Sequence, residues 1–359
     1  MRAIADLPPE ARPHGDRPLV LHFIDGLEIG GSQKIVFDLV RGLGARWDME
    51  IVTRYLDARV HFANFPVCIA PDEASLRAAI SRRPAVVHMH YWDRTRWLDQ
   101  ALAVLGAAWP GVPVIENVNS QNPPWLHPAV THFAYVSEYL RTYYAAAHVG
   151  TGELTSVVYP GVDTRKYAAR GPAPGEVVGL VYRLENDKLS RDTIEVLIAI
   201  VRARPTATIL LVGSGSNFGH YVARTRQARV RGRFDFAGLV PFDALPAYYD
   251  RMSLFCAPVH TETYGLVVPY AMAKGIPVCG YRVGALEELL GRSDSLVETP
   301  EALAALVSRL LVEPERRAAL AVGSRERVLE RFSLEAMLAA YAVLYAQALE
   351  GSGAGSRGA

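Results

Sequence analysis

The chain has 359 residues, of which 50% are hydrophobic and 21% are charged, a composition typical of a globular protein. Its length exceeds that of one ordinary domain and predicts two. Because the formal net charge is only +1, no overall field attracts nucleic acid or an anionic membrane, so an anionic ligand would need a local site.

The cysteines and the ends of the chain indicate the cellular compartment. Cys68, Cys256 and Cys279 lie far apart without a CxxC motif, which argues against a zinc cluster or a disulfide framework and favours a reducing, cytoplasmic location. No apolar run reaches the ~20 residues of a membrane span. Residues 1–18 lack the apolar core of a secretory signal and are expected to form a flexible lead-in, and 351–359 a flexible tail.

Short apolar runs alternate with helical patterns along the chain. In the first half, strands are predicted at 19–24, 49–53, 85–90, 112–118, 132–137 and 155–159, with a helix over 32–43 after the first strand. The pattern restarts after the Gly/Pro-rich stretch 170–176, with strands at 176–182, 206–213, 233–238, 253–258 and 276–281. This alternation predicts an α/β protein with two Rossmann-like domains and parallel sheets, 1–172 and 173–332. The helix predicted over 333–350 has a wide apolar stripe and is expected to pack on one domain or bridge both.

Ligands of open parallel sheets bind beyond the carboxyl ends of the strands, so polar residues that follow the predicted strands are candidates. In the segment 260–278, Gly265 would let a ligand approach the backbone, and the helix after it would direct free N–H groups at negative charge. Glu262 could accept hydrogen bonds from ligand hydroxyls. The alternative is an ordinary loop glycine beside a solvated glutamate.

Two cations follow the strand predicted at 176–182. The planar guanidinium of Arg183 and the compact ammonium of Lys188 together suit a diphosphate. The alternative is a pair of solvated surface cations. Because lysine occurs at only four positions in the chain, Lys188 is more informative than an average lysine.

Glycines gather in two further loops. The G-x-G turn of Gly213 and Gly215 is weak evidence for a nucleotide loop, and it lies mid-chain, whereas a Rossmann dehydrogenase carries its glycine fingerprint on the first strand. Gly30 and Gly31 predict a tight turn in which Ser32 caps the next helix. That turn either lets a phosphate or an acceptor near the chain or is purely structural.

Histidines and tryptophans occur near the ends of two strands of the first half. His88 and His90 are expected to point one into the core and one away, and such a pair is more often structural than metal-binding. Trp92 and Trp125 fall in predicted cleft loops, where an indole either stacks on a sugar or packs in the core. The sequence has no D-x-D, HExxH, G-x-S-x-G or P-loop motif, so the usual carboxylate pair for a nucleotide-bound metal is missing.

Together these pieces resemble the retaining glycosyltransferases of family 4 (glycosyl transferases group 1), which have the GT-B fold. The likeness spans nearly the whole chain, and its specificity comes from the combination of motifs. They lie at 30–33 (GGSQ), 160–163 (PGVD), 181–189 (VYRL, then KL), 213–215 (GSG), 236–240 (FAGLV) and 258–278 (from PVHTETYGL to AKGIPV).

The resemblance implies two domains that clamp a nucleotide sugar between them. It assigns the donor diphosphate to Arg183 and Lys188 and the sugar hydroxyls to Glu262, and these three are expected to carry catalysis. The other donor contacts are assigned to Gly30, Gly31, Gly213, Gly215, Val240, Tyr264, Gly265, Leu266 and Tyr270. The acceptor or sugar side is assigned to His90, Trp92 and Asn119.

The chemistry that the resemblance implies needs no metal and no cofactor beyond the nucleotide sugar as co-substrate. The sugar–phosphate bond breaks through an oxocarbenium-like state while negative charge builds on the leaving diphosphate. Arg183, Lys188 and the helix start would stabilise that charge. The departing phosphate would take the acceptor proton, and the sugar configuration would be retained. The partners expected are therefore a nucleotide sugar and a small-molecule acceptor.

The sequence departs from the family pattern at three positions. Tyr270 replaces the second glutamate of E-x7-E, which usually grips both ribose hydroxyls, so a dTDP-sugar donor is favoured, with UDP- and GDP-sugars as alternatives. Asn119 replaces a common histidine and hints at an altered donor sugar. Leu189 replaces a glycine, for which the sequence offers no explanation. The departures favour an enzyme of natural-product biosynthesis over one of wall or lipid assembly.

Two other functions remain open at this point. The missing second glutamate fits a catalytically inactive module that binds a nucleotide sugar. An epimerase of GT-B fold would act on its nucleotide sugar without an acceptor. A GT-B phosphorylase would need a lysine for its pyridoxal cofactor, and no lysine follows residue 274.

Overall fold

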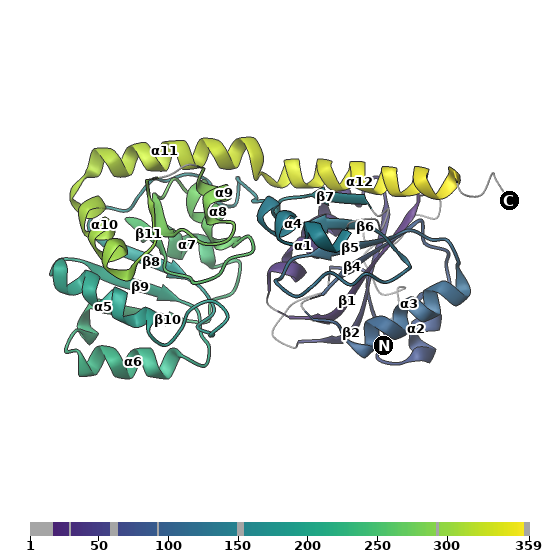
Figure 1. Cartoon of the computed structure of the whole chain (residues 1–359), viewed down its shortest axis with the longest axis horizontal. Helices are drawn as coiled ribbons and strands as arrows, with labels where there is room; N and C mark the ends of the chain where they lie inside the picture. The colour runs from purple at the N-terminus through teal and green to yellow at the C-terminus, as the bar shows by residue number, and fades with distance from the viewer. Residues whose placement is uncertain are drawn as a thin grey trace. The chain divides into compact units, whose positions relative to one another are not determined.

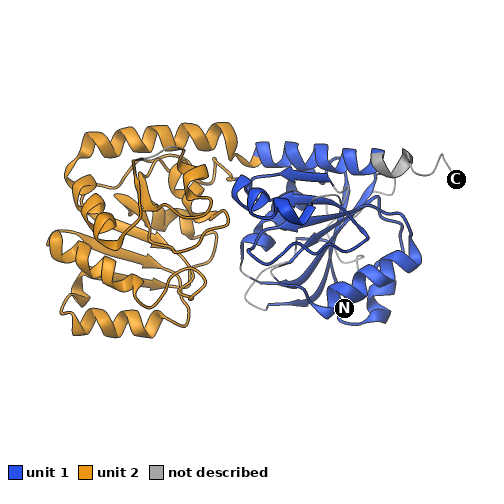
Figure 2. Cartoon of the chain, in the orientation of Figure 1, with its two compact units in different colours: residues 1–161, 335–359 blue, residues 162–334 orange. Residues whose placement is uncertain are grey.

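The computed structural model describes residues 17–28, 30–57, 64–91, 93–148, 154–291 and 294–354. The chain divides into two compact units (Figure 2), residues 1–161 with 335–359, and residues 162–334. Each unit contains one parallel β-sheet with helices packed against it (Figure 1). The prediction of an α/β chain with two parallel sheets is confirmed.

The sheet of the first unit has seven parallel strands in the order β3-β2-β1-β4-β5-β6-β7. Their bounds are β1 (Leu19–Leu27), β2 (Asp48–Leu56), β3 (Val67–Ile69), β4 (Val86–His90), β5 (Val114–Val118), β6 (Val130–Tyr135) and β7 (Leu154–Val157). The strand order reverses between β1 and β4. In doubly wound sheets the loops at such a reversal form the ligand crevice.

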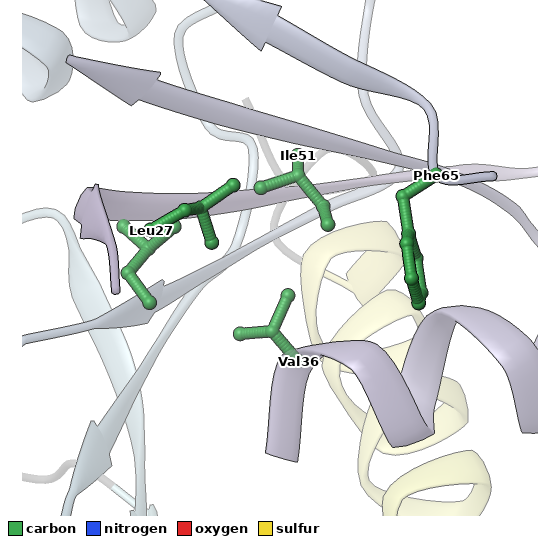
Figure 3. Packing of buried hydrophobic residues seen from close by; sticks show 5 residues of the cluster. Leu27, Val36, Ile51 and Phe65 are labelled. Carbon is green, nitrogen blue, oxygen red and sulfur yellow. The ribbon is translucent and has the colours of Figure 1, made fainter. Parts of the chain in front are cut away.

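The helices of the first unit are α1 (Gly31–Leu43), α2 (Glu73–Ala79), α3 (Arg96–Ala108), α4 (Glu138–Tyr143) and α12 (Leu334–Ala354). Side-chain caps set several of their starts, because Asp72, Thr95 and Ser137 each accept a hydrogen bond from a first-turn N–H. Between α1 and the sheet, a cluster of Ile24, Leu27, Val36, Ile51 and Phe65 is buried (Figure 3). This packing fixes α1, and with it the turn at Gly30 and Gly31, over the carboxyl end of β1.

The sheet of the second unit has six parallel strands in the order β10-β9-β8-β11-β12-β13. They are β8 (Val177–Val181), β9 (Thr208–Val212), β10 (Phe234–Gly238), β11 (Leu254–Ala257), β12 (Val278–Tyr281) and β13 (Leu296–Val297). The helices are α5 (Thr193–Ala203), α6 (Phe218–Gln227), α7 (Leu245–Tyr249), α8 (Val267–Ala273), α9 (Leu286–Leu290), α10 (Pro300–Val312) and α11 (Pro314–Arg331). Here the order reverses between β8 and β11, which places the loops after these two strands side by side.

The structure differs from the expected boundaries at the start of the second unit and at the end of the last helix. The second unit begins at Val162 rather than at 173, because Val162 pairs with Ser333 and the N–H groups of Gly171 and Ala173 bond to Lys274 and Met252. Residues 335–359 cluster with the first unit. The helix predicted to end at 350 continues to Ala354, while 1–16 and 355–359, which hold most of the expected flexible ends, lie outside the described residues.

Two smaller observations bear on the sequence predictions. All three cysteines, which lie within the described ranges, are free thiols, although Cys256 and Cys279 are register partners on β11 and β12. Within those ranges no helix has both the length and the apolar character required to cross a bilayer.

A buried carboxyl group lies in the middle strands of the first unit. The side chain of Glu116 on β5 accepts hydrogen bonds from the Tyr91 hydroxyl and from the backbone N–H of Trp125, 2.8 Å away. Burial raises the pKa of Glu116 to about 8, although both donors oppose the shift. The folded protein therefore holds this proton up to about pH 8, whereas the unfolded chain releases it above its ordinary pKa of 4.5.

We expect Glu116 to make stability fall as the pH rises from about 4.5 to 8, by about 1.4 kcal/mol per pH unit. Glu116→Gln should remove this slope, since the amide is neutral at every pH and still offers an oxygen to Trp125. Urea unfolding of both proteins at pH 6 and pH 7.5 measures the difference. Glu73→Gln, on an exposed part of α2, is the control. Equal slopes for wild type and Glu116→Gln would show that Glu116 is ionised in the fold.

Candidate functional site

The loops that follow β8 and β9 are fastened to one another by backbone groups. The N–H of Leu184 bonds to Ser214 O at 3.0 Å, and the N–H of Asn217 bonds to Leu184 O at 3.0 Å. The Glu185 carboxylate also accepts from the N–H of Ser216 at 2.8 Å. These bonds hold the loop that carries Arg183 and Lys188 in one position.

Gly213 and Gly215 make this fastening possible. Gly213 has a φ of +132°, and a Cβ atom there would lie 1.9 Å from the carbonyl oxygen of Tyr182. A Cβ atom at Gly215 would lie 2.6 Å from the oxygen of Leu184. Both glycines thus serve close packing between two loops, and the donor contact predicted for them stays a prediction.

Lys188 and Glu262 form a buried ion pair. The Nζ of Lys188 lies 2.7 Å from Oε1 of Glu262, and only 16% and 3% of the two side chains are exposed. They follow β8 and β11, which are hydrogen-bonded neighbours, and this adjacency joins residues 74 positions apart. The sequence predicted both residues at the site but assigned them to different parts of the ligand, and it did not predict the pair.

Two glycines hold the backbone around Glu262. At Gly265, with a φ of +80°, a Cβ atom would lie 2.6 Å from the carboxyl carbon of Glu262. At Gly284, with a φ of +52°, a Cβ atom would lie 1.9 Å from the Glu262 carbonyl oxygen, which also accepts from the N–H of Ala285 at 2.9 Å. Sequence reasoning missed Gly284. Its only signal was a glycine three residues after the strand predicted at 276–281.

Tyr182 is a second residue at this site that sequence reasoning missed. Its ring is buried, and its hydroxyl has no hydrogen-bond partner among the described residues. Burial first, and then the negative charge of Glu262, raise the pKa of Tyr182 far above its ordinary value. The hydroxyl therefore stays protonated within the electrostatic influence of Glu262.

Arg183 and the start of α8 complete the candidate site in the second unit. The guanidinium of Arg183 binds Asp187 at 2.7 Å, and 57% of the Arg183 side chain is exposed to solvent. The first residue of α8 follows Leu266 directly, and within the described chain no side chain caps that first turn. Val240 is buried in the loop after β10.

The two tyrosines predicted to bind the donor have packing roles in the structure. Tyr264 is buried edge-to-face against Phe332. Tyr270 is buried with its ring stacked on Tyr167 at 4.2 Å between centroids and an interplanar angle of 3°. An aromatic stack in the core therefore surrounds the ring of Tyr270. A contact with ribose stays a prediction.

The glycine turn of the first unit differs in one detail from the prediction. Gly30, not Ser32, occupies the N-cap of α1, and Gly31 is its first residue. The Ser32 hydroxyl instead accepts a hydrogen bond from Asn119 Nδ2 at 2.6 Å. Asn119 from the end of β5 is thereby fixed at the amino end of α1, in the crevice predicted from the strand order.

Of the two tryptophans predicted to lie in cleft loops, the structure describes one. Trp92 lies outside the described residues. Trp125 is buried and is covered by the guanidinium of Arg94 at 4.5 Å, so the core alternative holds for it.

His90 is fully buried, which corrects its assignment to the acceptor side. The expectation that His88 and His90 point to opposite sides is also wrong, because residues two apart on a strand share one face. Their rings lie 4.0 Å apart between centroids, together with His22. Burial lowers the pKa of all three histidines, to about 3 for His22, so all are neutral.

Comparison with known proteins shows the family of this chain. The family model of the glycosyl transferases group 1 matches residues 175–313. A D-inositol 3-phosphate glycosyltransferase of Segniliparus rotundus is 30% identical over 304 residues, covering 75% of this chain and 67% of the relative. A glycogen synthase of Mycobacterium tuberculosis is 27% identical over 298 residues, covering 76% and 70%. A 2-deoxystreptamine glucosyltransferase of Streptomyces kanamyceticus is 32% identical over 165 residues, covering 45% and 42%.

Solved structures share the fold at lower sequence identity. A sucrose-phosphate synthase of Thermosynechococcus elongatus superposes with a TM-score of 0.77 at 20% identity, covering 93% of this chain and all of that one. HepE of Anabaena, solved with UDP and glucose, gives a TM-score of 0.74 at 17% identity, covering 92% and 100%. These likenesses show the GT-B fold. The two parallel sheets, the matching family model and the relative that is 30% identical over 67% of the relative's own length agree with one another. The chain belongs to the glycosyl transferases group 1 and is a GT-B glycosyltransferase acting on nucleotide sugars.

Proposed function

We propose that the chain transfers a sugar from a nucleotide-diphosphate donor to a small-molecule acceptor, with retention of the anomeric configuration and without a metal. The buried pair of Lys188 and Glu262 carries this proposal. A buried ion pair contributes little net stability, because desolvation offsets the attraction. Two opposite charges kept beside each other after two neighbouring strands therefore fit a ligand that is anionic in one part and hydroxylated in the next.

The proposed roles follow from the charges of the site. A donor diphosphate would compete with Glu262 for the ammonium of Lys188, and Arg183 would add a second positive charge as the leaving group becomes more negative. Once released from Lys188, the carboxylate of Glu262 would accept hydrogen bonds from sugar hydroxyls. The hydroxyl of Tyr182, which has no partner among the described residues, would be a further donor to the sugar or phosphate.

In the proposed reaction the bond from the anomeric carbon to the phosphate oxygen breaks and the acceptor oxygen bonds to the same face of that carbon. The acceptor proton passes to the departing phosphate, so no side chain acts as a general base. Asn119 and the turn at Gly30 and Gly31 are proposed to contact the donor or the acceptor from the first unit.

For the donor we propose a dTDP-sugar, with UDP- and GDP-sugars as alternatives. Tyr270 stands where the family pattern has a glutamate for both ribose hydroxyls, and a deoxyribose has only one of that pair. For the acceptor we propose a natural product. The likeness to the 2-deoxystreptamine glucosyltransferase of Streptomyces kanamyceticus supports this proposal.

A panel of nucleotide sugars tests the proposal. We expect dTDP to raise the melting temperature more than UDP does, since bound ligand stabilises the native state. With the donor that works, Arg183→Ala should lower kcat/KM by about 10²-fold or more, as expected when a charge-stabilising group is lost. Arg191→Ala, an exposed arginine of the same loop region, is the matched control.

Three results would contradict parts of the proposed function. UDP bound much more tightly than dTDP would rule out the proposed donor. Nearly unchanged turnover in Arg183→Ala would contradict the role of that cation. Product with inverted configuration would overturn the proposed stereochemistry.

A further inference from the structure

Three histidines meet inside the first unit, on its neighbouring strands β1 and β4. His22 lies on β1, and its register partner on β4 is His88, so both side chains leave the sheet on the same face. His90 follows two residues later on that face. All three are fully buried, and one ring nitrogen from each lies within 4.8 Å of the others.

The hydrogen bonds inside this cluster leave nitrogen atoms unsatisfied. His22 Nδ1 and His90 Nε2 are 3.2 Å apart and share one proton. A neutral imidazole has one N–H and one bare nitrogen. In either tautomer, the two outer nitrogens, His22 Nε2 and His90 Nδ1, then hold one N–H and one lone pair, and neither has a partner in the described part of the chain.

His88 adds a third unsatisfied atom. Its Nδ1 lies 2.8 Å from the hydroxyl of Tyr345, while its Nε2 is buried without a partner among the described residues. A buried polar group without a hydrogen bond destabilises the fold, because it has lost its bonds to water without gaining a partner. Three such atoms in one layer of the core show that hydrogen bonds among the described residues do not satisfy this cluster, and the bare nitrogen of each neutral imidazole can instead bind a cation.

The cluster has the dimensions of a metal site. Two nitrogens bound to one tetrahedral Zn²⁺ at about 2.0–2.1 Å lie about 3.3–3.4 Å apart, close to the 3.2 Å between His22 Nδ1 and His90 Nε2. A ring nitrogen of His88 lies within 4.8 Å of a nitrogen of each of the other two histidines, so a shift of His88 would complete a set of three nitrogen ligands. Neutral imidazole is the ligand type that suits zinc, copper, iron and nickel.

A second layer of side chains supports the ligands. The hydroxyl of Tyr345 would orient His88 by accepting its Nδ1–H, as outer partners do for metal-bound histidines. Asn117, the register partner of His90 on β5, accepts a hydrogen bond from Tyr341 at 2.6 Å through Oδ1, and its Nδ2 has no partner within the described ranges. Turning that amide would present its oxygen as an acceptor for the His90 N–H.

We propose that His22, His88 and His90 bind one divalent d-block cation, with zinc as the test ion, in a structural site of the first unit. Because Tyr341 and Tyr345 belong to α12, the ion would also stabilise the packing of this helix on β4 and β5. The proposal does not depend on the transfer chemistry, which is proposed to need no metal.

The test uses the full chain, purified without a histidine tag and without chelators. We expect about one equivalent of metal per chain to survive dialysis. After a chelator removes it, added zinc should raise the melting temperature, and cobalt should produce the visible d–d absorption of a nitrogen-bound ion. His90→Gln should weaken zinc binding at least tenfold, while His132→Gln, at a buried histidine on β6 outside the cluster, should leave it unchanged.

Tyr345→Phe keeps the test decisive if histidine variants fail to fold. It preserves the ring and removes only the hydroxyl that holds His88, so we expect a folded protein with zinc affinity about 10-fold to 100-fold lower. The proposal is overturned if the chelated protein gains no stability from zinc. It is equally overturned if His90→Gln or Tyr345→Phe binds zinc as the wild type does, because the cluster would then be hydrogen-bonded histidine alone. Loss of transfer activity with normal zinc binding would bear on the proposed function and not on this site.

Discussion

Replacing Lys188 by methionine is expected to lower kcat/KM for sugar transfer by about 10²-fold or more and to destabilise the protein by about 3–5 kcal/mol. The activity falls because a positive charge beside the leaving diphosphate is lost. The stability falls because Glu262, with 3% of its side chain exposed, keeps a buried negative charge without its partner. Steady-state kinetics and urea unfolding at neutral pH measure the two effects.

A double-mutant cycle separates the two effects of this substitution. Lys188→Met combined with Glu262→Gln removes both charges, so it should recover most of the stability but none of the activity. Lys166→Met, at a lysine paired with an exposed aspartate, is the matched control and should change neither quantity greatly. Wild-type turnover in Lys188→Met would falsify the assignment of this cation. A double variant no more stable than Lys188→Met would show that the pair is not electrostatically coupled.

Replacing Gly284 by alanine is expected to lower kcat/KM by about 10²-fold, although Gly284 is not proposed to touch the substrate. The residue has a φ of +52°, and its new Cβ atom would lie 1.9 Å from the carbonyl oxygen of Glu262. The backbone at Glu262 must therefore move. A displacement of about 1 Å at a positioning residue can cost 10²-fold in rate. Kinetics with a saturating donor, together with the melting temperature, measure the result.

Gly219→Ala is the matched control for this glycine. It lies in α6, where a Cβ atom would meet nothing within 4 Å, and alanine is the better helix former by up to about 1 kcal/mol. We expect unchanged kinetics and equal or higher stability. If Gly284→Ala kept full activity, the backbone of Glu262 would have room to adjust, and the glycine would not position the carboxylate.

Local patterns were enough to predict most of the fold. The β-branched runs at 19–24, 85–90 and 206–213 form β1, β4 and β9, because each run is long and apolar enough to be buried on both faces of a parallel sheet. The strands β3 and β13 escaped prediction. They have three and two residues, too few to produce a periodic signal.

The sequence predicted which residues belong to the candidate site, but it did not predict which of them contact one another. Arg183, Lys188 and Glu262 stood out because each follows a strand. Which residue pairs with which depends on the strand order of the second unit, where β8 lies beside β11. Tyr182 and Gly284 were missed for the same reason. Each has a role only because the fold places it near Glu262.

The histidine cluster shows most clearly the difference between what local sequence predicts and what strand order decides. His88 and His90 were visible in the sequence as a pair, but their third partner, His22, is 68 residues away from His90 along the chain. Hydrogen bonding between β1 and β4 sets their register, and burial under α12 removes the water that would satisfy their nitrogens.

By itself, the sequence determined the class of fold, the two sheets and the cations and carboxylate after their strands, because hydrophobic periodicity and residue chemistry are local properties. The tertiary structure alone decided that Lys188 binds Glu262, that Tyr270 packs on Tyr167 and that three histidines meet. Those contacts join segments distant in the chain, and strand order and register, which no local pattern encodes, bring them together.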